Sequence, residues 1–318
     1  MPVDAHNALR HNAPMPTVIS SLLPVFAVIA LGQALRRARF LPDEVWPPLD
    51  RLNYFVLFPA LILHTLMTAD LGALAVGPMA GALLAAVATM LAVVAALRWL
   101  VPMSGPQYSS VFQGTLRWNG FVAIAALGNL YGEPGVALAA IAIAVLVPTL
   151  NVLSVLVLTR NAGGPPPTQA RTLGLMVRNP LILACAAGIG WQLTGLTLPA
   201  AAEMLLDVLG SAALALGLLS VGAALRLAGG RASLVLVALT TGLKLAGVPL
   251  LVAAWTWVFG VEGLARTAAI MVGSVPTATS SYILARQLGG DAELMALLVT
   301  STTVAAMVTM PAAAWLAG

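Results

Sequence analysis

The stretch that decides the fold is residues 271–291, MVGSVPTATSSYILARQLGGD. It begins as an apolar helix, meets Pro276, continues through a cluster of hydroxyl side chains and then becomes helical again. A proline inside a helix removes one backbone donor and frees the carbonyl one turn earlier. In lipid such groups cannot turn to bulk water, so the protein or a ligand must use them. Because secondary transporters form substrate and ion sites from broken helices, the stretch predicts such a site.

The composition restricts the chain to one class of protein. Of its 318 residues, 60% are hydrophobic and 8% are charged, whereas soluble domains carry about 25% charged residues. A spanning helix needs about 20 apolar residues, and the polar breaks leave room for about ten such helices. We therefore predict an all-α polytopic membrane protein.

The predicted helices are separated by short polar or glycine- and proline-containing breaks. Their ranges are 17–35, 49–67, 74–99, 108–131, 135–158, 177–194, 204–225, 233–259, 263–287 and 292–316. Residues 1–16 have no apolar core and are predicted to be an N-terminal tail. A linker at 160–176, rich in glycine and proline, separates two five-helix halves, 17–159 and 177–318.

The arginines predict the orientation of these helices. Arg10 and Arg266 fall on one side of the ten-helix map, and most of the others fall on the opposite side. That larger set is Arg36, Arg37, Arg39, Arg98, Arg160, Arg171, Arg178, Arg226, Arg231 and Arg286. Because positive loops stay in the cytoplasm, both termini are predicted on the non-cytoplasmic side of a cell inner membrane. The net charge of +4 thus indicates orientation and not nucleic-acid binding.

The two halves share a register. Pro24 and Gly32 lie 156 residues before Pro180 and Gly188, and Asp50 lies 157 residues before Asp207. Near the ends of the fourth and ninth helices, Gly132-Glu133 corresponds to Gly290-Asp291 at an offset of 158. An odd number of helices per half places the halves in opposite orientations. The pattern predicts an inverted repeat of five helices.

The same register points to a second break in the fourth helix. It places Asn119 and Gly120 opposite Thr277 and Ala278. Glycine costs a helix about 1 kcal/mol relative to alanine, so this dipeptide is the weakest point of its segment. Two broken helices that cross near the midplane would bring two helix N-termini together, each equivalent to about half a positive charge. Such a pair favours an anionic ligand.

Several of these motifs resemble one known family. The segments are LLPVFAVIALGQALRR (22–37), LDRLNYFVLFPALILHTL (49–66), RWNGF (117–121), LYGE (130–133) and PTATSSYILARQLGGDAELMA (276–296). They resemble the auxin efflux carrier family, in particular its bacterial branch, whose members are often labelled malonate or malate transporters. The resemblance implies broken, crossing helices 4 and 9, a scaffold of helices 1, 2, 6 and 7 that dimerises, and a mobile core of helices 3–5 and 8–10. It also implies an elevator-type transport cycle.

The chain departs from the family pattern at two positions. Many members carry a proline in the fourth-helix break, where this chain has Asn119 and Gly120. Many also carry an asparagine in the ninth helix at the position of Ser280. The long hydrophilic loop of the plant auxin exporters is absent as well, so the resemblance does not imply auxin as the substrate.

Two basic residues are candidates for contact with an anion. Lys244 is the only lysine and lies about ten residues from either end of the eighth helix, where an ionisable group is costly and indicates function. It would attract an anion or exchange a proton, and the alternative is an ion pair that joins two helices. Arg117 either reaches toward the cytoplasm or pairs with a substrate carboxylate.

The polar residues of the two breaks complete the candidate site. Pro276, Thr277, Thr279 and Ser280 form one side, and Asn119 with Gly120 forms the other. The alternatives are a simple proline kink, hydroxyls bonded to carbonyls of their own helix, and an asparagine that joins helices. Asp50 and Asp207 are expected at the starts of their helices, where a carboxylate meets the N-terminal dipole.

Enzyme, cofactor and metal-site motifs are absent from the sequence. The sequence therefore predicts a secondary transporter of a small organic anion, with a carboxylate as the favoured group and H+ or Na+ as the coupling ion. Two alternatives are a sodium-coupled symporter of the bile-acid-carrier type and a membrane sensor without transport. Sodium dependence of flux and binding without flux would distinguish them.

Overall fold

The computed structural model describes residues 14–69, 76–161, 179–226 and 234–317. Most of the predicted tail and linker, together with Arg10, Arg171, Arg178 and Arg231, lies outside these residues. All regular elements in the described ranges are helical. The protein is a polytopic membrane protein, and six of its described helices are long and apolar enough to span a membrane. These are Met15–Arg37, Val76–Leu100, Gly105–Asn161, Ala200–Ala224, Leu234–Val258 and Ala292–Ala317.

The first half of the chain contains long helices and several interrupted ones. In order they are α2 (Met15–Arg37), the short 3-10 turn η1 (Asp43–Val45), α3 (Trp46–Leu52), η2 (Asn53–Leu57), α4 (Phe58–Thr68), α5 (Val76–Leu100), α6 (Gly105–Leu116) and α7 (Gly120–Asn161). Gly132 divides α7, because its φ of 66° is not helical. The chain therefore turns where the sequence predicts a break between 131 and 135.

The second half begins with a shorter apolar helix. Its elements are α9 (Pro180–Thr194), α10 (Ala200–Ala224), α11 (Leu234–Gly242), η4 (Leu243–Gly247), α12 (Val248–Val258), α13 (Gly263–Ser274), α14 (Ser280–Leu288) and α15 (Ala292–Ala317). Two predicted helix starts are wrong. Asp50 lies inside α3, which begins at Trp46, and Asp207 lies inside α10, which begins at Ala200. Prolines near both true starts favour the earlier boundaries, since proline fits the first turn of a helix.

Two of the helices widen into a π-helical segment just before a proline. The segment η2 precedes Pro59, and η4, which contains Lys244, precedes Pro249. A proline ring clashes with the carbonyl four residues earlier, and a wider turn relieves the clash. Widened turns of this kind are frequent at functional sites. The sequence predicts continuous helices here, and the structure adds these local changes.

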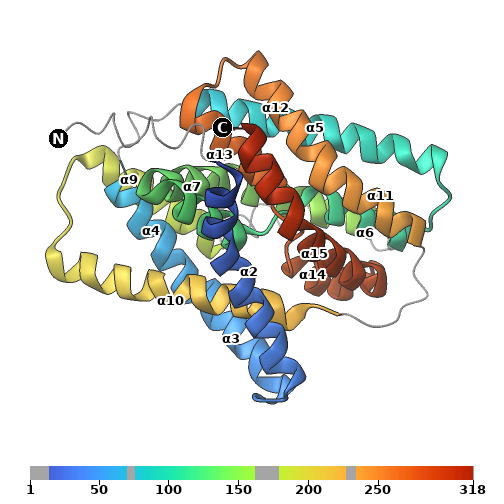
Figure 1. The fold of residues 1–318 in the computed structure, drawn as a ribbon, viewed down its shortest axis with the longest axis horizontal. Coiled ribbons are helices and arrows are strands. Elements are labelled where there is room, and N and C mark those ends of the chain that lie inside the picture. The colour runs from blue at the N-terminus through green and yellow to red at the C-terminus, as the bar shows by residue number, and fades with distance from the viewer. Residues whose placement is uncertain (1–13, 70–75, 162–178, 227–233, 318) are drawn as a thin grey trace.

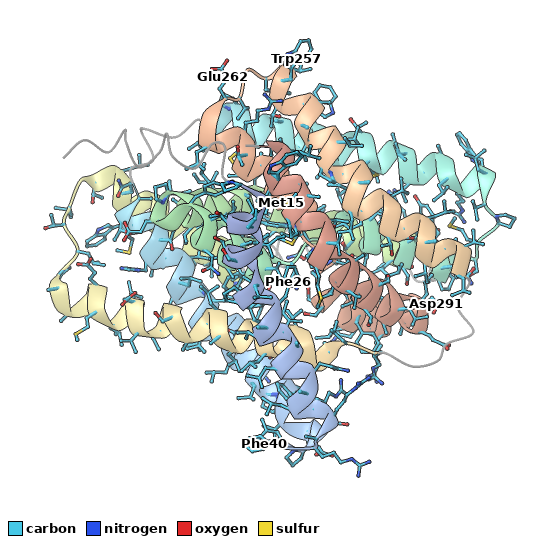
Figure 2. The ribbon with its side chains drawn as sticks, in the orientation of Figure 1. Met15, Phe26, Phe40, Trp257, Glu262 and Asp291 are labelled. Carbon is cyan, nitrogen blue, oxygen red and sulfur yellow. The ribbon has the colours of Figure 1, made fainter. Side chains whose placement is uncertain are left out.

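The helices form two groups around α7 (Figure 1). In one group α2 and α4 pack on α10, and α9 packs on α4. In the other group α5 packs on α12, α12 on α13, and α13 on α15. Figure 2 shows Phe40, just after α2, and Glu262, just before α13, at opposite ends of the molecule. Helix α7 contacts members of both groups.

Glycines allow two helix pairs of the first group to approach closely. A side chain at Gly32 of α2 would collide with the backbone of Leu219 in α10. A side chain at Gly188 of α9 would press on Leu66 and Leu63 of α4. Small residues permit this close packing, which stabilises helix pairs in lipid.

We predict that Gly32→Ala destabilises the protein and that Gly242→Ala does not. A methyl group at Gly32 has no room against the Leu219 backbone, whereas one at Gly242 meets no atom within 4 Å. Overpacking costs about 1–3 kcal/mol, and alanine stabilises an unobstructed helix position by up to about 1 kcal/mol. Thermal unfolding in detergent measures both effects. Equal unfolding temperatures for the two variants would contradict the close contact between α2 and α10.

Candidate functional site at the helix crossover

Two helix interruptions form the centre of the candidate site. Residues 117–119 separate α6 from α7, and residues 275–279 separate α13 from α14. The backbone is extended where each first helix ends, with ψ of 137° at Arg117 and 153° at Val275. Proline explains the second break, because the residue before it is restricted to extended conformations.

The two breaks are hydrogen-bonded to each other. The N–H of Asn119 donates to the carbonyl of Pro276 over 3.0 Å. The Thr277 hydroxyl donates to the carbonyl of Gly114 over 2.5 Å, and the Thr277 N–H donates to the Thr302 hydroxyl over 3.2 Å. Thr277 is fully buried, and its N–H and its hydroxyl therefore both have partners within the protein. This threonine fastens one break to the other.

Asn119 also shapes the start of α7. Its side-chain oxygen accepts a hydrogen bond from the N–H of Val122 over 3.3 Å, which is the geometry of a helix N-cap. Its amide nitrogen is buried and has no partner among the described residues. Gly120, the next residue, faces the ring of Phe58, which lies 3.4 Å from where a side chain would begin. The structure thus explains the break without a proline.

Several backbone donors at the crossover remain available. Across the described ranges, no hydrogen bond involves the N–H groups of Gly120 and Phe121 at the start of α7. The same holds for the N–H groups of Ala278, Thr279 and Ser280 at the start of α14. Free N–H groups and the helix dipole together make a helix N-terminus a site for anions.

Arg117 brings a full positive charge to the start of α14. Its guanidinium donates to the side-chain oxygen of Asn151 over 3.0 Å and to the Ser280 hydroxyl over 3.0 Å. Ser280 is exposed, whereas Asn151 is half-buried. Arginine presents further donors that can grip a carboxylate with two hydrogen bonds. Arg117 therefore lies between the fifth predicted helix and the ninth, at an accessible edge of the crossover.

Lys244 lies on a different side of the crossover. It is buried and lines a narrow cavity of about 20 Å³, together with Trp118, Val272 and apolar side chains of α5. That volume holds about one water molecule. No acidic side chain in the described ranges pairs with Lys244. Trp118 and Arg117 are neighbours in an extended segment, which explains why they face opposite sides.

The comparisons with known proteins agree with this architecture. Residues 170–313 match the family described as membrane transport protein. An uncharacterized transporter of Methanothermobacter thermautotrophicus is 24% identical over 297 residues, which cover 92% of this chain and 95% of that protein. The chain is similar to membrane transporters of the auxin efflux carrier family. The resemblance seen in the sequence is thereby confirmed, and this family consists of transporters and not enzymes.

The structure separates the predicted site residues into two sets. The larger set lies at or beside the crossover, and it comprises Arg117, Asn119, Gly120, Pro276, Thr277, Thr279 and Ser280. Lys244 reaches only the cavity behind Trp118. Groups of three or more histidine, cysteine or acidic side chains that could hold a metal do not occur in the described ranges.

Two polar residues near the crossover were not predicted from the sequence. Asn151 holds the Arg117 guanidinium, and Gln113 lies one turn before Arg117. Gln113 is fully buried, and both polar atoms of its side chain lack a partner among the described residues. The available signal was an isolated amide in an apolar helix, which is costly unless it is used.

We predict that Thr277→Val destabilises the crossover and that Thr277→Ser does not. Valine keeps the shape but leaves the buried Gly114 carbonyl without the hydroxyl donor, at a cost of about 1–3 kcal/mol. Serine keeps the hydroxyl. Thermal unfolding of the purified variants tests this difference. If valine were as stable as the parent and serine were not, the hydroxyl would have no role in joining the breaks.

Proposed function

We propose that this chain is a secondary active transporter of a small organic anion, with a carboxylate group that binds beside the crossover. The observation that carries the proposal is the position of Arg117, whose guanidinium bonds Ser280 at the free N-terminus of α14. A guanidinium and unpaired backbone N–H groups all favour negative charge. A substrate carboxylate at this point would replace contacts that Arg117 makes with the neutral side chains of Asn151 and Ser280.

The polar partners of Arg117 support this assignment. Asn151 and Ser280 accept some of the hydrogen bonds that Arg117 can donate, but neither residue carries a counter-charge. Ion pairs with Arg117 do not occur among the described residues. A partly buried charge without a counter-charge is costly, and an anionic substrate would relieve that cost when it binds. Asn119 would add its unpaired amide nitrogen, and Thr279 would present its hydroxyl at the same helix start.

Glycine contacts support the inverted repeat. Gly32 meets Leu219, and Gly188 meets Leu63. Gly32 and Gly188 differ by 156 positions, and Leu63 and Leu219 also differ by 156. A two-fold relation between the halves would exchange one contact for the other. This agreement favours ten membrane segments in two opposed sets of five, with α6–α7 and α13–α14 as the crossing pairs.

The two packed groups support an elevator-type motion. The group of α2, α3, α4, α9 and α10 would form the scaffold, and the others would carry the crossover across the membrane. Phe121, at the start of α7, packs on Phe58 with ring centres 4.3 Å apart and lies against Gly217. These apolar contacts carry no hydrogen bonds, so sliding there would break few directional interactions. A homodimer through the scaffold remains a prediction from the family resemblance.

Two hydrogen bonds between helix ends support the predicted orientation. Arg98, near the end of α5, donates to Asn161 at the end of α7 over 3.0 Å. Asp291, just before α15, donates its N–H to the carbonyl of Pro106 near the start of α6. These ends therefore lie on one side, which we assign to the cytoplasm of an inner membrane because of its arginines. Both termini would then lie on the opposite side.

Arg117→Gln is expected to lower transport at least tenfold, with Arg117→Lys intermediate. Loss of a charge-assisted hydrogen bond costs about 1.5–3 kcal/mol, or about ten- to a hundredfold. The test is uptake of labelled dicarboxylates and aromatic acids into proteoliposomes, with and without sodium. Arg98→Gln is the matched control, because Arg98 makes an arginine–asparagine bond of the same length at an exposed helix end. Equal losses in both variants, or none in either, would refute the role of Arg117.

Lys244→Met is expected to reduce transport while leaving the protein as stable as the parent or more stable. Methionine fits the apolar cavity, and replacing a buried charge by an apolar side chain of similar volume is often neutral or stabilising. Uptake and thermal unfolding would be measured on the same preparation. A variant with unchanged uptake and lower stability would show that Lys244 serves only the structure.

A further inference from the structure

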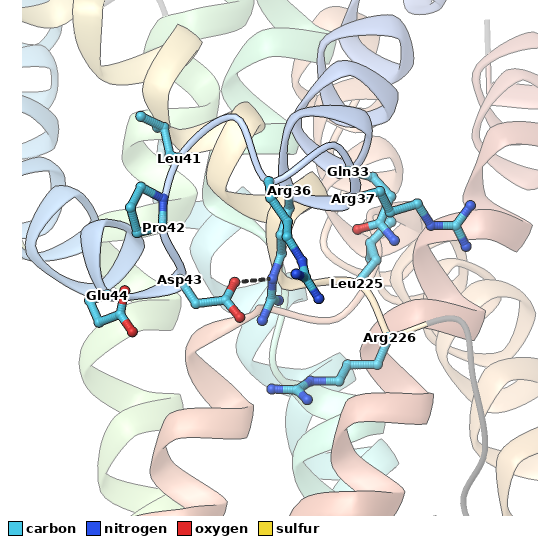
Figure 3. Close-up of a pocket in the computed structure, with 10 residues that line it drawn as sticks. Gln33, Arg36, Arg37, Leu41, Pro42, Asp43, Glu44, Leu225 and Arg226 are labelled. Atoms are coloured by element: carbon cyan, nitrogen blue, oxygen red, sulfur yellow. Dashed lines mark hydrogen bonds and ion pairs between the residues drawn. The ribbon is translucent and has the colours of Figure 1, made fainter.

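A second basic site lies at the end of α2, away from the crossover. Here a pocket of about 520 Å³ is lined by residues from the turn after α2, from η1 and from the segment that follows α10 (Figure 3). Its charged residues are Arg36, Arg37, Arg39, Arg226, Asp43 and Glu44. The lining thus carries four guanidinium groups and two carboxylates, which leaves an excess of positive charge.

The ion pair in this pocket uses only one arginine. Arg36 donates from Nε to the Asp43 carboxylate over 3.0 Å and from Nη1 to the carbonyl of Ala223. These bonds tie the end of α2 to the end of α10. Arg37, Arg39 and Arg226 make no ion pair with any described residue, and all three are exposed. Figure 3 shows Arg36 and Arg226 extending toward each other, whereas Arg37 extends away.

The local backbone holds the pocket open. In the turn after α2, Arg39 has a left-handed conformation with φ of 51°, and the N–H of Phe40 donates to the carbonyl of Leu35 over 3.0 Å. The negative ends of two helix dipoles explain why arginines lie here. The dipoles supply no ion-pair partner for Arg37, Arg39 and Arg226, so the pocket keeps an excess of positive charge.

We propose that this pocket binds the phosphate group of an anionic membrane lipid. Guanidinium groups match phosphate oxygens with paired hydrogen bonds, and basic pockets at the cytoplasmic ends of membrane helices bind anionic headgroups. Leu41 lines the pocket, and the ring of Phe40 beside it is 71% exposed, as suits contact with acyl chains. The lining contains no aromatic ring on which a nucleotide base could stack. The source of the phosphate is therefore assigned to lipid.

Arg226 connects this pocket to the helices of the crossover. Its N–H donates to the Thr300 hydroxyl of α15 over 2.9 Å, and its guanidinium lies 5.7 Å from the ring centre of Tyr282 in α14. Tyr282 is two residues beyond Ser280. A lipid phosphate that draws Arg226 away from Tyr282 would change the contact between the α2–α10 group and α14. The binding claim itself does not depend on any transport activity.

Lipid binding to the full chain in detergent tests the proposal. Thermal unfolding and native mass spectrometry would use phosphatidylglycerol, phosphatidylcholine, inorganic phosphate and ATP as separate probes. We expect phosphatidylglycerol to stabilise the parent protein and to remain bound. Arg39→Gln with Arg226→Gln should weaken that binding roughly tenfold or more, and Arg98→Gln should not. Arg36 stays unchanged because its bonds support the fold.

Several results would contradict the assignment of a lipid phosphate to this pocket. Equal binding of phosphatidylcholine, or unchanged lipid binding in the double variant, would overturn the proposal. Stabilisation by phosphate or ATP without phosphatidylglycerol would overturn the assignment to lipid. If the double variant unfolds at a lower temperature without lipid, the single variant Arg226→Gln replaces it, with at least a threefold loss of lipid binding expected. An unchanged affinity in that single variant would equally overturn the proposal.

Discussion

The backbone hydrogen bond between Asn119 and Pro276 is the contact on which the arrangement of the crossover depends. Polar backbone groups inside a bilayer must find partners within the protein. By bonding two interrupted helices to each other, the chain satisfies some of the backbone groups that each interruption would leave unpaired. Thr277 adds the same kind of contact to Gly114. What remains unpaired is then concentrated at two helix starts, where unpaired donors favour an anion.

The sequence predicted the helices and the breaks well because both have strong local causes. Pro276 forces an extended residue before it, and the weak Asn119–Gly120 point became a helix start capped by Asn119. The sequence did not indicate which neighbours would meet at the break. Arg117 and Lys244 were both candidates in the sequence, but they face different surroundings, with Trp118 beside Lys244 and Arg117 beside Ser280. Contacts of this kind depend on tertiary packing, which no local pattern encodes.

Other differences from the sequence-based prediction have equally specific causes. Helix-start predictions at Asp50 and Asp207 relied on apolar runs, while the true starts lie earlier, in polar and proline-containing turns. The π-helical segments before Pro59 and Pro249 depend on how a helix relieves a steric clash. The π-helical segment before Pro249 places Lys244 on a widened turn. Asn151 was missed because a single amide in a long apolar helix has no distinctive spacing.

The two basic residues near the crossover, Arg117 and Lys244, differ in their surroundings. Arg117 has neutral hydrogen-bond acceptors at an accessible edge, so it could exchange a polar neighbour for a charged substrate with little change in packing. Lys244 has apolar neighbours and no room for more than a water molecule, so a substrate could reach it only after the helices separate. In the transport cycle that we propose, the first environment suits recognition of the anion. The second environment suits a charge that stays within its own helix group, because α5, α12 and α13, which surround Lys244, pack on one another. We therefore propose different roles for the two charges: Arg117 would act on binding of the anion, and Lys244 would act within the helix group that carries the crossover.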